Sequence, residues 1–172
     1  PQLAKSWKAN KAATQWTFTL VKGAKFSDGS ALDAKAVKAV FDYAIDEKTV
    51  TQERNKIKSI TNVKASGDNV IFTLSDPNAL FPEAIAWIKM IKVSEVANFN
   101  KKPSTSGPYM VSAFSPNESL TMVANPKYFG KKANVKTIKF VKAADPTAAV
   151  TSLRSGDIDV MYQLPLADAA PL

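Results

Sequence analysis

The sequence predicts an α/β domain, a single lobe with a mixed sheet, and three observations support this fold class. Residues 15–21 alternate between large apolar side chains and smaller ones, as a half-buried strand does. Residues 34–46 repeat apolar side chains at intervals of three and four, the spacing of an amphipathic helix. Residues 135–161 follow the order strand, helix, strand, which predicts a crossover within one sheet.

The first strand and helix define the expected core. Trp16, Phe18 and Leu20 lie on one face of the 15–21 strand, and turn residues follow at 27–29. Asp33 stands where an N-cap is needed, so the helix is expected to begin there and to run to about Asp46. The predicted core residues are Trp7, Trp16, Phe18, Leu20, Val37 and Phe41.

A β-hairpin is predicted next, with strands over residues 57–65 and 70–74 joined by the turn at 66–69. A short helix over residues 79–86 follows. We expect residues 87–93 to form a strand, in which apolar and basic residues share both faces. A further short helix is expected from Ser94.

The second half of the chain predicts further strands and one helix. Gly107 and Pro108 predict a tight turn into a strand, in which the glycine is free to adopt a positive φ and the proline fixes the next φ. Asp145 and the proline after it predict a helix start, and Gly156 predicts its left-handed C-cap. The predicted strands cover residues 109–114, 119–124, 135–141 and 158–161.

The composition narrows the chemistry that the chain can perform. The 172 residues include no cysteine and no histidine. Thiolate metal sites, disulfides, thiol nucleophiles and Ser-His-Asp catalysis are therefore excluded, and we expect no cofactor. No apolar run approaches the roughly 18 residues of a membrane span.

The net charge of +8 raises the question of nucleic-acid binding. Lysines fall singly or in pairs along the whole chain and do not cluster with aromatic residues. This pattern is typical of a solvated lysine-rich surface, so nucleic acid is not an expected partner.

Five short phrases stand in fixed order along the chain: PQLAKSW (1–7), WTFTLVKGAKFSDG (16–29), TSGPY (105–109), NPKYFGKK (125–132) and LRSGDID (153–159). Together they resemble the oligopeptide, dipeptide and nickel-binding family of bacterial ABC-importer solute-binding proteins, known as family 5. Val21, Ser106 and Phe129 stand where the family usually has arginine, threonine and tryptophan.

The resemblance implies the fold and the function. It implies a two-lobed, periplasmic-binding-protein-like type II fold, of which this chain is expected to be an N-terminal lobe fragment that does not hold the ligand alone. The whole protein would be a non-enzymatic monomer outside the cytoplasmic membrane, free in the periplasm or lipid-anchored. It would deliver a small solute, a nickel chelate or a short peptide, to an ABC permease.

The resemblance also implies an internal division of the lobe. Residues 1–33 and 105–165 would form its main part, residues 34–104 an inserted subdomain, and residues 166–172 the start of the connection to a second lobe. The middle segment resembles the nickel-binding branch in length.

The expected ligand-binding residues are Lys89, Trp87 and Tyr162. Lys89 interrupts an apolar stretch, where a lone ammonium group is costly unless it is paired or faces a wet cleft. In relatives that bind nickel as an organic-acid chelate, a basic residue in this stretch grips carboxylates. Asp157 and Asp159 form a D-x-D pair, which we interpret as solvated turn acids and not as a metal site.

Two other classes remain open. A carboxylate-dependent hydrolase would need two acids about 5–10 Å apart in a pocket. An adhesion or scaffold module would use the lysine-rich surface, and its binding to acidic polymers would weaken with salt.

Overall fold

The computed structural model describes residues 2–99 and 103–162. It divides into two compact units, which are described separately. The first comprises Pro1–Phe114 and Thr121–Ile138, and the second comprises Ser115–Leu120 and Lys139–Leu172. The predicted connection at residues 166–172 lies outside the described residues.

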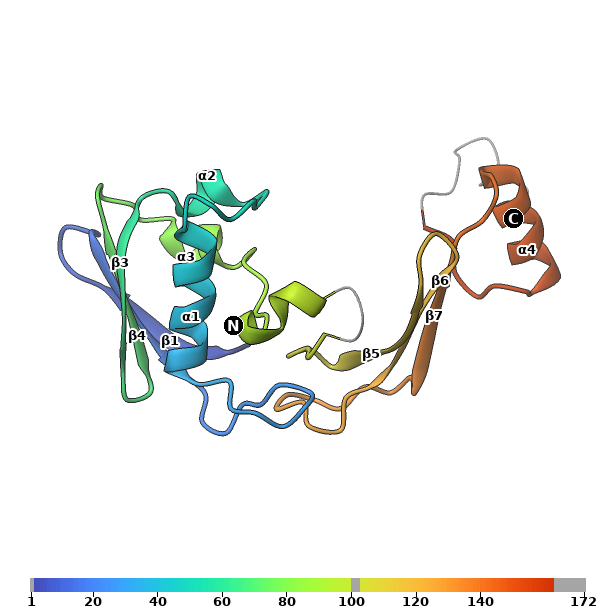
Figure 1. The fold of residues 1–172 in the computed structure, drawn as a ribbon, viewed down its shortest axis with the longest axis horizontal. Coiled ribbons are helices and arrows are strands. Elements are labelled where there is room, and N and C mark those ends of the chain that lie inside the picture. Colours follow the sequence, from blue (N-terminus) through green and yellow to red (C-terminus); the bar gives the residue numbers. More distant parts are fainter. Residues whose placement is uncertain (1, 100–102, 163–172) are drawn as a thin grey trace. The chain divides into compact units, whose positions relative to one another are not determined.

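A four-stranded antiparallel sheet forms the centre of the first unit (Figure 1). Its spatial order is β1-β2-β4-β3. The alternation in the sequence matches the burial of β2, where every second side chain is buried. The strands are β1 (Ala4–Ala9), β2 (Gln15–Leu20), β4 (Asn69–Leu74) and β3 (Ile60–Ser66).

The hairpin of β3 and β4 confirms the predicted turn, where Gly67 adopts a positive φ of 56°. The first strand begins later than predicted, because the short helix α2 (Arg54–Ile57) comes before it. Strand β1 was not predicted. All but one of its residues are exposed, so it lacks the alternation that reveals a half-buried strand.

Helix α1 (Ala34–Ile45) lies against one face of this sheet (Figure 1). The Asp33 side chain accepts hydrogen bonds of 2.9 Å from the backbone amides of Lys35 and Ala36, which confirms the predicted N-cap. At the other end, the guanidinium group of Arg54 donates to the backbone carbonyl of Ile45 at 3.1 Å. It also donates to the carbonyls of Asp46 and Thr49. Side chains therefore cap both ends of α1.

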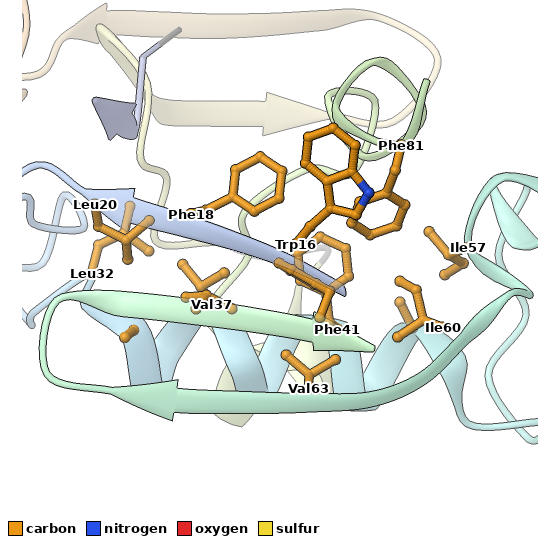
Figure 2. Packing of buried hydrophobic residues seen from close by; sticks show 14 of the residues in the cluster. Trp16, Phe18, Leu20, Leu32, Val37, Phe41, Ile57, Ile60, Val63 and Phe81 are labelled. Carbon is orange, nitrogen blue, oxygen red and sulfur yellow. The ribbon is translucent and has the colours of Figure 1, made fainter. Parts of the chain in front are cut away.

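Aromatic side chains fill the space between the sheet and its helices (Figure 2). Phe72 meets Phe41 edge to face, with ring centroids 4.7 Å apart, and Trp16 lies 6.3 Å from Phe81. The prediction that Trp16, Phe18 and Leu20 are buried beside Val37 and Phe41 is confirmed.

Trp7 does not belong to the buried core, so this part of the prediction is wrong. Its side chain stacks on Phe18 but remains 44% exposed, because β1 is the edge strand of the sheet.

The segment after β4 contains helix α3 (Phe81–Ile85) and the 3-10 helix η1 (Val93–Asn98), in line with the two short helices predicted there. The strand predicted over 87–93 is wrong. Residues 87–92 form a turn, a bend and irregular backbone. The amide of Ile88 donates back to the carbonyl of Ile85, which continues the turn of α3. Within this irregular segment, Trp87 and Lys89 are exposed, whereas Ile88 and Met90 are partly buried.

A second sheet has the order β5-β6-β7. The predicted hairpin is confirmed, and Asn117 in its turn has a φ of 63°. Strand β7 begins two residues later than predicted. The strands are β5 (Tyr109–Ser115), β6 (Ser119–Ala124) and β7 (Thr137–Val141).

Helix α4 (Pro146–Ser155) has both predicted caps. Asp145 accepts from the amide of Ala148 at 2.8 Å, and Gly156 has a φ of 81°. The strand predicted over 158–161, and with it the crossover, is wrong. The backbone amides of Asp157 and Ile158 donate to the carbonyl of Ser152. These residues therefore form part of the C-terminal cap of α4 and do not begin a strand.

Candidate functional site

A cavity of about 1110 Å³ lies within the first unit. Side chains of the sheet and of α1 form one part of its lining, including Phe18, Phe41 and Phe72. Other segments complete the lining, including Ile88 and Met90 after α3, Phe99, Met122 of β6 and Phe129. Ligand pockets usually have such a largely apolar lining, with a few polar groups that set the orientation of the ligand.

The polar groups of the lining differ in whether they already hydrogen-bond to other described residues. The hydroxyl of Thr105 donates to the carbonyl of Tyr109 at 2.9 Å, and the hydroxyl of Ser106 donates to the carbonyl of Met90 at 3.4 Å. The Tyr109 hydroxyl donates to the carbonyl of Val135 at 3.0 Å. Lys89 also lines the cavity and is exposed, and it makes no hydrogen bond or ion pair within residues 2–99 and 103–162. Its ammonium group can therefore accept an anionic ligand.

Trp87 lies two residues from Lys89 but does not line the cavity. Its ring is 55% exposed. The ammonium group of Lys56 lies 4.3 Å from the ring centroid and also pairs with Glu53 at 2.6 Å. The indole is thus a cation–π partner of α2, while its exposed area can still contact a ligand.

Tyr162 lies in the second unit, where its side chain is 88% exposed. Asp157 and Asp159 in the same unit are exposed and occupy bends, as expected of solvated turn acids. Asp157 accepts a hydrogen bond of 2.6 Å from the hydroxyl of Ser155.

Three charged residues near the cavity form a cluster that we call the ionic junction: Asp28, Lys92 and Glu95. Lys92 pairs with Asp28 and, at 3.3 Å, with Glu95. The pair with Lys92, followed by the hydrogen bond from the Ser30 hydroxyl, lowers the pKa of Asp28 to about 2. The backbone amide of Ser104 lowers the pKa of Glu95, and Asp28 raises the pKa of Lys92. All three groups are therefore held in their charged forms.

Hydrogen bonds join three segments beside the ionic junction, and each segment carries one of the phrases that resemble the family. Ser27 and Thr105 exchange two hydrogen bonds, Ser27 N to Thr105 O at 2.8 Å and Thr105 N to Ser27 Oγ at 3.0 Å. The buried side chain of Asn125 donates to the carbonyl of Gly107 at 2.9 Å, and its backbone amide donates to Pro108. Segments far apart in the sequence are thus fixed to one another.

Lys127 and Gly29 complete this arrangement. The ammonium group of Lys127 donates to the carbonyl of Asp28 at 2.9 Å. Gly29 has a φ of 96°, and a Cβ there would lie 2.8 Å from that ammonium nitrogen. Gly107, which was free to adopt a positive φ, does not adopt one. The described glycines with positive φ are Gly23, Gly29, Gly67 and Gly156.

The sequence alone did not reveal the ionic junction. Asp28 was interpreted as a turn residue and Lys92 as part of a strand, and their separation of 64 positions gave no local signal. The one indication in the sequence was that residues 16–29 and residues 105–109 both carry the family resemblance.

The described residues show two further absences. No helix among them is both long and apolar enough to cross a membrane. No three of their histidine, cysteine, aspartate or glutamate side chains gather in a way that could hold a metal ion.

The chain belongs to the bacterial extracellular solute-binding proteins, family 5, whose family model, described as "Middle", matches residues 1–172. The expected family is therefore confirmed. A structural match to a nickel ABC transporter protein from Bacillus halodurans, with a TM-score of 0.87 and 26% identity over 99% of this chain, confirms the predicted type II lobe.

Curated relatives agree with this assignment. The chain is 37% identical to Protein XP55 of Streptomyces lividans over 83% of its residues. It is 31% identical to the nickel-binding periplasmic protein of Escherichia coli K12 over 94% of its residues. The chain spans 28% and 33% of the lengths of these two relatives, and 35% of the Bacillus halodurans chain.

Proposed function

We propose that the chain is part of the substrate-binding component of an ABC importer, which captures a small solute outside the cytoplasmic membrane and delivers it to a membrane permease. The observation that carries this proposal is the cavity of about 1110 Å³ in a chain of this family, with Lys89 in its lining. Family membership supports a binding role in place of a catalytic one.

We infer that Lys89 holds an anionic oxygen of the solute, such as a carboxylate. A charge-assisted hydrogen bond in a site of low polarity is stronger than one between neutral groups. Trp87 would offer the exposed area of its ring to the same ligand, and the binding role that the sequence suggests for Tyr162 stays a prediction. The roles of Lys89 and Trp87 extend the expectations drawn from the sequence.

The proposed ligand is a nickel chelate or a short peptide, both of which carry carboxylates. The nickel-binding relative supports the first of these. Because the chain contains no histidine or cysteine, its own contribution to a chelate would be contacts to the organic part and not bonds to the metal.

The mechanism that we propose is closure of two lobes on the solute. A ligand can shift the open and closed populations only by its difference in affinity for the two states. Most binding free energy would therefore depend on both lobes, and the chain alone is expected to bind weakly. The whole protein would work as a monomer in the periplasm or at a lipid anchor.

The structure gives the hydrolase alternative little support. Among the acids that the structure describes, Glu83 alone lines the cavity, whereas Asp28 and Glu95 lie outside the lining and both pair with Lys92. With both carboxylates held ionised, neither can act as the general acid that glycoside hydrolysis needs. Chromogenic glycosides test this alternative directly.

The test of the proposal is the variant Lys89→Met in the protein expressed from its complete coding sequence, with Lys64→Met as the control. Both changes remove one exposed lysine charge, but Lys64 lies on β3 and does not line the cavity. Calorimetry with nickel(II) and excess L-histidine, and with trialanine, measures the affinity.

Lys89→Met is expected to weaken binding of the ligand that the wild type accepts by about 1.5–3 kcal/mol, the range for hydrogen bonds to charged groups. Lys64→Met should bind as the wild type does. Unchanged affinity in Lys89→Met would remove Lys89 from the site, and a wild type that binds neither probe would contradict the proposed ligand classes.

A further inference from the structure

The segment of residues 86–92, which carries Lys89, has no regular secondary structure of its own. At its start, the amides of Ala86 and Ile88 donate to the last turn of α3 at 3.2 and 3.1 Å. A segment without a hydrogen-bonded ladder samples many conformations unless side chains restrict it. The position of the Lys89 ammonium group therefore depends on what holds the other end of this segment.

The ionic junction holds that other end. Lys92 follows Lys89 by three residues, and its ammonium group lies between the carboxylates of Asp28 and Glu95. Asp28 is itself fixed, because its carboxylate accepts from the backbone amide and the hydroxyl of Ser30 at 2.9 and 2.7 Å. The segment is thus anchored to a turn more than sixty positions earlier in the sequence.

The same junction fixes the loop that shares the cavity lining with Lys89. Glu95 accepts from the amide of Ser104 at 2.8 Å and from its hydroxyl at 2.9 Å. Two residues later, the hydroxyl of Ser106 donates to the carbonyl of Met90, next to Lys89. Lys92 and Glu95 therefore join the segment that carries Lys89 to the loop of residues 104–106.

We propose that Asp28, Lys92 and Glu95 are positioning residues of the ligand site, which hold the 86–92 segment and the 104–106 loop in the arrangement that presents Lys89 to the solute. This inference rests on the proposed role of Lys89. A site that is ordered before binding loses less conformational entropy when the ligand arrives, so the junction raises affinity without touching the ligand.

Loss of the ionic junction should change the local order of the site and not the global stability of the protein. Its side chains are about one third exposed, and such pairs contribute little to global stability. The aromatic core under α1 does not include them. Their loss should therefore loosen residues 86–92 and 103–106 locally and leave the four-stranded sheet as it is.

Hydrogen–deuterium exchange on the ligand-free protein, expressed from its complete coding sequence, tests the local effect. Lys92→Met and Asp28→Asn break the pair, whereas Lys92→Arg retains a cation that both carboxylates can bind. Lys38→Met is the matched control, because it breaks an ion pair with Asp42 on the surface of α1.

Peptides that cover 86–92 and 103–106 should exchange about threefold to tenfold faster in Lys92→Met and Asp28→Asn, the scale of a local loss of one or two such interactions. Lys92→Arg and Lys38→Met should match the wild type there, and peptides over 60–74 should not change in any variant. Unchanged exchange at 86–92 and 103–106 in Lys92→Met, or an equal rise across the sheet, would overturn the proposal.

Affinity for nickel(II) with excess L-histidine, or for trialanine, gives the functional readout. Lys92→Met should weaken binding about threefold to tenfold, and Lys92→Arg should restore it. If Lys89→Met weakens binding while Lys92→Met does not, the positioning role is wrong and the proposed function stands. If the wild type binds neither probe, the proposed ligand classes fail, and faster exchange in Lys92→Met confined to 86–92 and 103–106 still supports the positioning role.

Discussion

The sheet region of the first unit and the helical region of the second unit differ in how much they bury. Four strands and α1 enclose a core that includes Phe41, Phe72 and Phe81, each at most 2% exposed. In the described part of the second unit, the buried residues are Ala149 and Val150 of α4, while Phe140 and Val160 remain exposed. The sheet region therefore has its own source of stability, and α4 depends mainly on its caps.

The largest expected effect is on the aromatic core. Phe72→Ala removes a ring that contacts Phe18, Phe41 and Phe81, so we expect the free energy of unfolding to fall by about 3–5 kcal/mol. Chemical denaturation monitored by circular dichroism measures this change. Val150→Ala in α4 is the comparison, and an equal loss from the two substitutions would contradict the difference between the regions.

The N-caps of α1 and α4 are both aspartates, so the same substitution can be compared in the two regions. Asp33 caps α1 and Asp145 caps α4, and each substitution to alanine removes side-chain hydrogen bonds to backbone amides. Each change should cost its helix about 1 kcal/mol. Because α1 covers the core, Asp33→Ala should lower the midpoint of the main unfolding transition, whereas Asp145→Ala should chiefly speed amide exchange within α4. A lower main midpoint in Asp145→Ala alone would reverse this assignment.

The smallest expected effect is a dependence on acid. The folded-state pKa of Asp28 is about 2, below the value of an unfolded aspartate near 3.9. Its contribution to stability is therefore complete above about pH 4 and is lost as the pH falls through about 2. Glu95, with its pKa also lowered, acts in the same direction.

Thermal melts between pH 5 and pH 2 measure that dependence. The melting temperature of Asp28→Asn should fall less steeply over this range than that of the wild type. Parallel curves for the two proteins would show that Asp28 does not titrate with folding.

The sequence predicted those elements whose pattern is local. The alternation of β2, the stripe of α1 and the capping residues Asp33 and Asp145 depend on near neighbours, and all of them were predicted. Strand β1 was missed because its edge position leaves most side chains exposed, so it has no alternation. The expected strands at 87–93 and 158–161 were wrong because short apolar runs cannot show whether a strand partner exists.

Less of the candidate site could be predicted, because most of its contacts join residues far apart in the sequence. Lys89 could be selected because a charge in an apolar stretch is locally unusual. The ionic junction depends on contacts between residues 28, 92, 95 and 104, which only the fold brings together. The internal division at residues 33 and 105 stays a prediction, as do the binding roles of Trp87 and Tyr162.

The measurement that tests the central claim most directly is a crystal structure of the protein, expressed from its complete coding sequence and grown with the solute that it binds in calorimetry. We predict that the ammonium group of Lys89 lies about 2.7–3.2 Å from an anionic oxygen of that solute, with Lys92 still between Asp28 and Glu95. A solute bound away from the cavity, with Lys89 in contact only with water, would contradict the account.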